Sequence, residues 1–318
     1  MSVFLLFPIW FGKIAFQATE VPTPSAVPVP VIVNTGVETE LLQEPVCGPT
    51  VHVSGSIAED TWWSAGYVYV IDSDVTVNAG ATLRIDSVVI KAKNSASLYI
   101  NGDVLAVGTQ NYPVYFTSWK DDTLCGDTNG DGSTTTPAPG DWGYIQFGPN
   151  SGSNSTISRT IIRYAGQDLY QGGAIRLNNA SPNLTYITFT DNYRNAAEVV
   201  SGDWTTNTWD STSVVYWLGG SVRVSHGNTL TVSPGVKVKM RSVYDSLLVE
   251  GKLAANGTAT DTITFTSEKD DEVCGTGAMG EPVCDTNNDG TASAPAVKSW
   301  GHIEFRTSSD ASSIIRYT

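Results

Sequence analysis

The chain has 318 residues, of which 41% are hydrophobic, and its formal net charge is −14 at neutral pH. The hydrophobic fraction is enough to bury a sizeable core. The negative charge repels phosphate backbones and anionic lipid heads, so nucleic acids and membrane surfaces are excluded as expected partners, whereas calcium suits such a surface. Thirty glycines with only 16% charged residues favour short strands joined by tight turns.

The first 20 residues read MSVFLLFPIWFGKIAFQATE, an apolar run that leads to Ala18. This pattern resembles a secretory signal peptide, and residues 1–18 are predicted to be one, which implies an extracellular or cell-surface location. The alternative is a buried or wrongly started segment, because no positive charge precedes the run and Pro8 and Lys13 interrupt it. Residues 19–46 are predicted to be a proline-rich, extended linker. No membrane insertion of the mature module is expected.

A long internal repeat organises the rest of the chain, with copy one at 47–199 and copy two at 200–318. Matching short motifs recur at offsets of 147, 155, 149, 158 and 153 residues, namely Thr61-Trp62 with Thr208-Trp209, Thr76-Val77 with Thr231-Val232, Phe116 with Phe265, Asp127 with Asp285, and Arg163-Tyr164 with Arg316-Tyr317. Such drift is typical of small insertions between stacked units. Copy one continues about 35 residues past its IIRY motif and copy two does not, so the chain is expected to be C-terminally truncated.

Period-two alternation of apolar residues predicts short, half-buried strands throughout both copies. The residues expected inside are Leu98, Ile100, Val104, Ala106, Val114 and Phe116 in copy one, and Leu247, Val249, Leu253, Ala255, Ile263 and Phe265 in copy two. No window predicts a capped helix longer than a turn or two. A propeller needs a blade signature every 40 to 50 residues, and an immunoglobulin-like sandwich needs about seven strands per ~100 residues. No blade signature recurs at that period, and a copy of 147 residues is too long and too rich in strands for one sandwich.

The runs VTVNAGATLRI, SLYINGDVLAVGTQNYPVYFTSWKDD, PAPGDWGYIQF and TIIRYAG, with their copy-two equivalents, resemble the right-handed parallel β-helix repeats of large bacterial secreted and cell-surface proteins. The resemblance covers residues 53–318. It implies an all-β solenoid in which each coil of roughly 20 residues places one strand on each of three parallel sheets, with rungs about 4.8 Å apart and about ten to twelve rungs in all.

Two acidic loops carry the clearest binding signal. Asp127, Asn129 and Asp131 in copy one, and Asp285, Asn287 and Asp289 in copy two, stand at positions 1, 3 and 5 of a loop with glycine at position 6. This is how a calcium loop of the EF-hand type begins, because oxygen side chains at alternate positions converge where glycine permits a sharp turn. Calcium is therefore the expected cofactor. The alternative is an Asn/Asp/Gly-rich turn that holds no ion.

The loops depart from that pattern at position 12, where a bidentate Glu is replaced by Ala138 and Ala296. The missing carboxylate must come from elsewhere. The Lys-Asp-Asp before each loop is the nearest repeated source, so Asp122 and Asp271 are predicted to complete the two sites. Asp141 offers a further carboxylate in copy one only, because its counterpart is Ser299.

Cysteine and tryptophan residues give weaker signals. Cys274 and Cys284 lie ten residues apart within one loop, a spacing that permits a disulfide worth about 2–3 kcal/mol, whereas Cys47 and Cys125 have no evident pairing. The repeated Trp142 and Trp300 are expected to be packing anchors. The unmatched tryptophans are the better candidates for ligand stacking, namely Trp63, Trp204 and Trp217.

Catalysis has little support, because the three histidines form no motif with a Ser, a Cys or each other. The favoured function is a secreted or surface-anchored β-helix module with calcium-ordered loops and a structural or adhesive role, whose partner would be an extracellular polysaccharide or other surface ligand. The alternatives are a polysaccharide lyase or epimerase of the β-helix type, with Arg163 or Arg316 as base, and a threonine-lined face that binds ice or another crystal.

Overall fold

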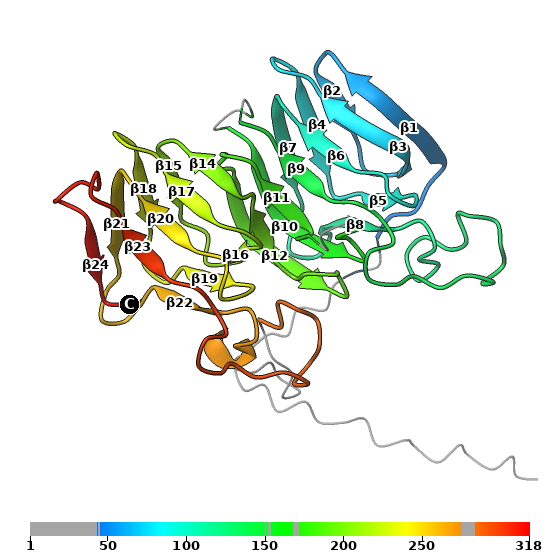
Figure 1. The fold of residues 1–318 in the computed structure, drawn as a ribbon. Coiled ribbons are helices and arrows are strands. Elements are labelled where there is room, and N and C mark those ends of the chain that lie inside the picture. Colours follow the sequence, from blue (N-terminus) through cyan, green and yellow to red (C-terminus); the bar gives the residue numbers. More distant parts are fainter. Residues whose placement is uncertain (1–42, 44, 150, 152–153, 168–171, 275–283) are drawn as a thin grey trace, which may run out of the picture. The chain divides into compact units, whose positions relative to one another are not determined.

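The computed structural model describes residues 43, 45–149, 151, 154–167, 172–274 and 284–318 (Figure 1). The predicted signal peptide and almost all of the predicted linker lie outside the described residues. Leu41–Thr318 form one compact unit. No helix within the described ranges is long and apolar enough to cross a membrane.

The described residues form 24 strands and one short 3-10 helix. The strands of copy one are β1 (Thr50–Ile57), β2 (Thr61–Trp63), β3 (Val68–Val77), β4 (Thr82–Asp86), β5 (Val89–Ala92), β6 (Leu98–Ile100), β7 (Asp103–Val107), β8 (Val114–Ser118), β9 (Ile145–Phe147), β10 (Thr156–Arg163), β11 (Ile175–Leu177) and β12 (Asn183–Thr190). The strands that follow are β13 (Ala197–Val199), β14 (Gly202–Trp204), β15 (Asn207–Trp209), β16 (Val215–Leu218), β17 (Val222–Val224), β18 (Thr229–Val232), β19 (Lys237–Met240), β20 (Leu247–Val249), β21 (Lys252–Asn256), β22 (Thr264–Ser267), β23 (Ile303–Phe305) and β24 (Ile314–Arg316). The 3-10 helix is η1 (Asp271–Cys274).

All the recorded strand pairs are parallel, and the chain winds as a β-helix of about nine turns, somewhat fewer than the ten to twelve expected. Each turn contributes a first, a second and a third strand, and equivalent strands of successive turns pair side by side. In copy one the first strands make face one, the second strands face two and the third strands face three; long strands such as β3 and β10 bend from one face to the next. The all-β solenoid predicted from the sequence is thus confirmed.

Where copy two follows copy one, each kind of strand moves to the next face of the solenoid. Strand β13, which takes the place of the first half of β1, pairs with β11 of face two and then with β16. The first strands of copy two therefore continue face two of copy one, while its second and third strands form the two four-stranded sheets β14-β17-β20-β23 and β15-β18-β21-β24. Pairing between β11 and β13 makes the copies one continuous solenoid rather than two separately folded domains.

The core consists of inward-facing side chains from all three faces, stacked from turn to turn. Eleven of the twelve residues predicted to lie inside are buried, and Phe265 is partly buried against the same core. Alternation within strands predicts this well, because successive side chains point to opposite faces of a sheet.

The strand register aligns the two copies differently from the alignment predicted from short sequence motifs. Strand β18 takes the place of β4, so Thr231 corresponds to Arg84 at an offset of 147 and the expected jump to 155 is wrong. A second correction concerns tryptophan: Trp63 stacks on Tyr69 at 5.1 Å as Trp209 stacks on Tyr216 at 5.4 Å. Trp209 thus matches Trp63 and not Trp62. A one-residue slip matters in a strand because it moves the side chain to the opposite face.

Candidate metal centres

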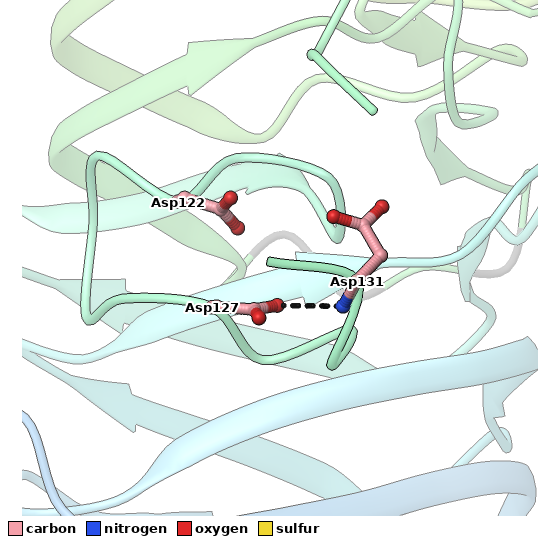
Figure 2. A group of neighbouring side chains, drawn as sticks. All are labelled: Asp122, Asp127 and Asp131. Atoms are coloured by element: carbon pink, nitrogen blue, oxygen red, sulfur yellow. Dashed lines mark hydrogen bonds between the residues drawn. The ribbon is translucent and has the colours of Figure 1, made fainter. Parts of the chain in front are cut away.

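The first acidic loop leaves the solenoid after β8 and returns at β9. It brings Asp122, Asp127 and Asp131 together, so that one carboxylate oxygen of each lies within 4.8 Å of the others. Figure 2 shows the three side chains gathered from separate bends of the loop. The carboxylate expected to replace position 12 therefore lies beside the two loop aspartates.

Backbone amides shape this loop around the first aspartate. The Asp127 carboxylate accepts hydrogen bonds from the amides of Gly130 at 2.7 Å, Gly132 at 2.8 Å and Asp131 at 3.2 Å, the last drawn in Figure 2. Gly130 and Gly132 have φ values of 73° and 65°, which side chains rarely adopt. Asn129 donates from its amide nitrogen to the Asp131 carboxylate at 2.9 Å. The position-6 glycine thus has the role in the turn that the sequence pattern predicts.

The second loop repeats the arrangement between β22 and β23. Asp271, the first residue of η1, lies with Asp285 and Asp289 in a second cluster, in which one carboxylate oxygen of each again lies within 4.8 Å of the others. The Asp285 carboxylate accepts from the amides of Asp289 at 3.0 Å and Gly290 at 2.8 Å, and Asn287 donates to Asp289 at 2.7 Å. Two loops separated by 158 residues in sequence therefore fold to the same local structure.

Several oxygens in these clusters are buried and accept no hydrogen bond within the described residues. They are Oδ1 of Asp122 and Oγ1 of Thr128 in the first loop, and Oδ1 of Asp271, Asn287 and Asp289 in the second. Of these, Oδ1 of Asp271 lies 3.9 Å from the Lys239 ammonium, an ion-pair distance. Asp271 is only 5% exposed. Burial raises its pKa to about 6, the Lys239 ammonium works in the opposite direction, and the charges of Asp285 and Asp289 raise it further. A buried oxygen without a partner is costly, and a cation is one group that would satisfy it.

A buried lysine lies beneath each loop, a feature the sequence analysis missed. Lys91 in β5 and Lys239 in β19 are both fully buried. The Lys91 ammonium donates to the carbonyl oxygens of Gly126 at 2.8 Å and Asp121 at 2.9 Å, and the Lys239 ammonium donates to that of Cys284 at 2.7 Å. Gly126 and Cys284 each directly precede the first aspartate of a loop. The signal available in the sequence was a lysine recurring at an offset of 148 inside an apolar strand.

The remaining acidic residues beside the first loop are committed to ion pairs. Asp121 is fully buried and accepts from Arg163 and from Thr117. Asp141 accepts from the Lys120 ammonium at 2.7 Å and is not part of the three-carboxylate cluster. Arg163, the candidate base of the lyase alternative, is therefore held in a buried ion pair. Arg316 instead lies over the ring of Tyr317 at 4.7 Å.

Both loops begin beside a disulfide. Cys274 pairs with Cys284, as the spacing permits, and Cys47 pairs with Cys125 across 78 residues. No free cysteine remains. The second pairing could not be read from the sequence, because it depends on how the chain winds between the two cysteines.

Tryptophan burial corrects one expectation and agrees with another. Trp63, Trp204 and Trp217 are at most 2% exposed, so they cannot stack on a ligand. Trp142 is fully buried against Phe116, and Trp300 packs partly buried against the core, as expected for anchors.

One histidine has neighbours that the sequence analysis did not anticipate. His302 lies 3.4 Å from the hydroxyl of Ser246 and 3.5 Å from the carboxylate of Glu304. Both distances are long for an activated nucleophile, and Ser246 is only 4% exposed. The arrangement therefore has the residue types of a hydrolase triad without an accessible nucleophile.

Comparison with protein-family models, with curated proteins and with solved structures finds no match to this chain.

Proposed function

We propose that this chain is a secreted or cell-surface β-helix module with a structural or adhesive role, in which each acidic loop is ordered by one calcium ion. One observation carries the proposal: the same three-carboxylate cluster is built twice, at equivalent places of an internal repeat, with buried oxygens that have no hydrogen-bond partner among the residues that the structure describes. The two disulfides are typical of an oxidising, extracytoplasmic compartment.

The donor set selects the kind of metal. Each cluster offers three carboxylates, and an asparagine side chain stands between two of them in the sequence. Oxygen donors of this kind suit hard cations, and a flexible cage of carboxylates and carbonyls suits Ca²⁺ better than Mg²⁺, which demands near-ideal octahedral geometry. The cysteines nearest the clusters are held in disulfides, which leaves no thiolate for a softer metal.

Calcium would order loops that have little regular structure of their own. Long excursions of this kind inside a compact domain are uncommon unless they are functional. Binding to the folded state alone stabilises by about 2.7 kcal/mol at a hundredfold excess of ligand over Kd. The buried lysines and the disulfides hold the start of each loop, and the ion would hold the rest.

The lyase or epimerase alternative has less support. Arg163, the candidate base, is held by a buried carboxylate, and the Ser246 hydroxyl beside His302 is buried. A fold shared with such enzymes does not supply an active site.

Titration calorimetry with Ca²⁺ tests the proposal. The wild-type protein is expected to bind two ions, Asp122→Asn one, Asp271→Asn one, and the double variant none. Each substitution keeps the size of the side chain and removes one charge, and the untouched loop serves as the internal control. If the wild type binds no calcium, or the double variant still binds two ions, the calcium part of the proposal is wrong. Release of unsaturated sugars from an acidic polysaccharide by the wild-type protein would instead support the lyase.

A further inference from the structure

An outward-facing row of side chains on face three differs sharply between the copies. In copy one it consists of Trp62 on β2, Arg84 on β4 and Leu105 on β7, which are aligned by the strand register. Trp62 is 62% exposed, although its neighbour Trp63 is buried in the core. A large aromatic side chain left in solvent on a regular sheet calls for an explanation.

Copy two provides the comparison. Its equivalent strands β15, β18 and β21 place Thr208, Thr231 and Ala254 in the same row. In copy two both neighbours of each of these residues in its strand are buried; in copy one the same holds except for Thr61, which is partly buried. Because small residues suffice at these positions of the same fold, the solenoid itself does not require the tryptophan, the arginine or the leucine.

The surroundings of Trp62 combine one flat apolar surface with both kinds of hydrogen-bonding group. A shallow depression of about 230 Å³ is lined by Asp60, Thr61, Trp62, Thr82, Arg84 and Leu105. Asp60 accepts from the Thr82 amide through one oxygen, at 2.9 Å. Arg84 forms no ion pair among the described residues, in contrast to Arg223 of copy two, which pairs with Asp203 at 3.3 Å.

We propose that the Trp62 row of copy one is a binding site for a neutral polysaccharide, with one pyranose ring stacked on the Trp62 indole. The C–H face of a pyranose is apolar and matches the aromatic surface, whereas its hydroxyls need donors and acceptors at the edge. The Arg84 guanidinium supplies donors and the Asp60 carboxylate supplies an acceptor. Acidic polysaccharides fit less well, because Asp60 and the net charge of −14 repel them.

This inference deepens the adhesive role in the proposed function, on which it rests, and it does not involve the calcium loops. The test is ¹⁹F NMR of the whole chain labelled with 5-fluorotryptophan, in which the Trp62 resonance is assigned from Trp62→Thr. The probes are cellohexaose, xylohexaose, mannohexaose and maltohexaose, with hexagalacturonate as the acidic probe. At least one neutral hexasaccharide is expected to shift the Trp62 resonance, and hexagalacturonate is not.

The variants use the residues that copy two already carries. Trp62→Thr and Arg84→Thr are each expected to weaken binding, as measured by calorimetry, by about tenfold or more. Tyr244→Thr removes another exposed aromatic residue, 86% exposed, and is expected to leave binding unchanged. The inference is overturned if no neutral hexasaccharide binds, if both substitutions at the row leave the affinity unchanged, or if hexagalacturonate binds better than the neutral probes.

Measurements in calcium and in EDTA separate the two proposals. Sugar binding is expected to be the same in calcium and in EDTA, because the Trp62 site lies apart from the loops. Sugar binding by a protein that takes up no Ca²⁺ when Ca²⁺ is supplied overturns only the calcium part of the proposed function. Two bound calcium ions with no sugar binding overturn only the Trp62 site.

Discussion

Replacing the buried lysine beneath the first loop, Lys91→Met, is expected to loosen that loop without unfolding the solenoid. Methionine keeps the apolar stem and removes the ammonium, so the carbonyls of Gly126 and Asp121 lose their donor. A hydrogen bond from a charged group contributes roughly 1.5–3 kcal/mol, which gives about 3–6 kcal/mol for the two. Burial disfavours the charged form of Lys91 and so lowers its pKa. Removing the charge removes this desolvation cost, which offsets part of the loss of the two hydrogen bonds. The net loss is expected to be about 2–4 kcal/mol.

The loss should be local, because turns of a solenoid interact chiefly with their neighbours. A loss of that size raises the opening equilibrium constant of the first loop by roughly 30- to 700-fold. Hydrogen exchange in EDTA measures it at the amides of Gly130 and Gly132, which are bonded to Asp127. Lys239→Met is the matched control, since it should affect the second loop and leave the first unchanged.

A local role for Lys91 is refuted if Lys91→Met leaves exchange in the first loop within about threefold of the wild type, a difference of less than 1 kcal/mol. It is refuted equally if both variants accelerate exchange in both loops to the same extent, because the lysines would then act through global stability rather than through the carbonyls they contact.

Three further changes test the loops, the turns and the core. Asp131→Ala should make the first loop sensitive to protease in calcium, as EDTA is expected to do in the wild type, while the second loop stays protected. Equal cleavage of both loops in calcium would contradict independent sites. Gly102→Ala and Gly251→Ala should each cost about 2 kcal/mol or more in thermal unfolding, because the added methyl group would lie 2.2 Å from a backbone oxygen, whereas Gly80→Ala, with open space around it, should cost about 1 kcal/mol. Burial raises the pKa of Tyr216 to about 12, above its unfolded value, so stability present below pH 10 should fall by up to about 3 kcal/mol between pH 10 and 12. Tyr216→Phe should flatten that decline in alkaline unfolding curves, and an unchanged slope would show that another group titrates.

Much of the fold could be predicted because every second residue of a β-helix strand points inward and is apolar. Leu98 and Ile100 alternate with Ser97, Tyr99 and Asn101, and both are buried. Leu247 and Val249 are buried in the same way in copy two, although the residue between them is Leu248. The two loops could be located for a similar reason, since oxygen side chains at alternate positions before a glycine are a local pattern.

What could not be predicted depends on register and on winding. Adjacent tryptophans, Trp62 and Trp63, are equivalent in a sequence match, and only pairing with the next strand decides which one faces the core. Lysine in a strand usually points to solvent, and the burial of Lys91 depends on the loop whose carbonyl oxygens it contacts. The partner of Cys47 depends on how the 78 residues that separate it from Cys125 wind through the solenoid and bring Cys125 back beside it.

The rotation between the copies bears on how the two loops act. Each loop leaves the solenoid between the first and second strands of one turn, namely between β8 and β9 in copy one and between β22 and β23 in copy two. If the first strands of both copies lay on the same face, both loops would leave the solenoid from the same corner between two faces. Because the first strands of copy two continue face two of copy one instead, the second loop leaves from the next corner, several turns further along. Like charges that far apart are largely screened at physiological ionic strength. The two sites are therefore expected to bind their ions independently, which makes each loop a valid control for the other.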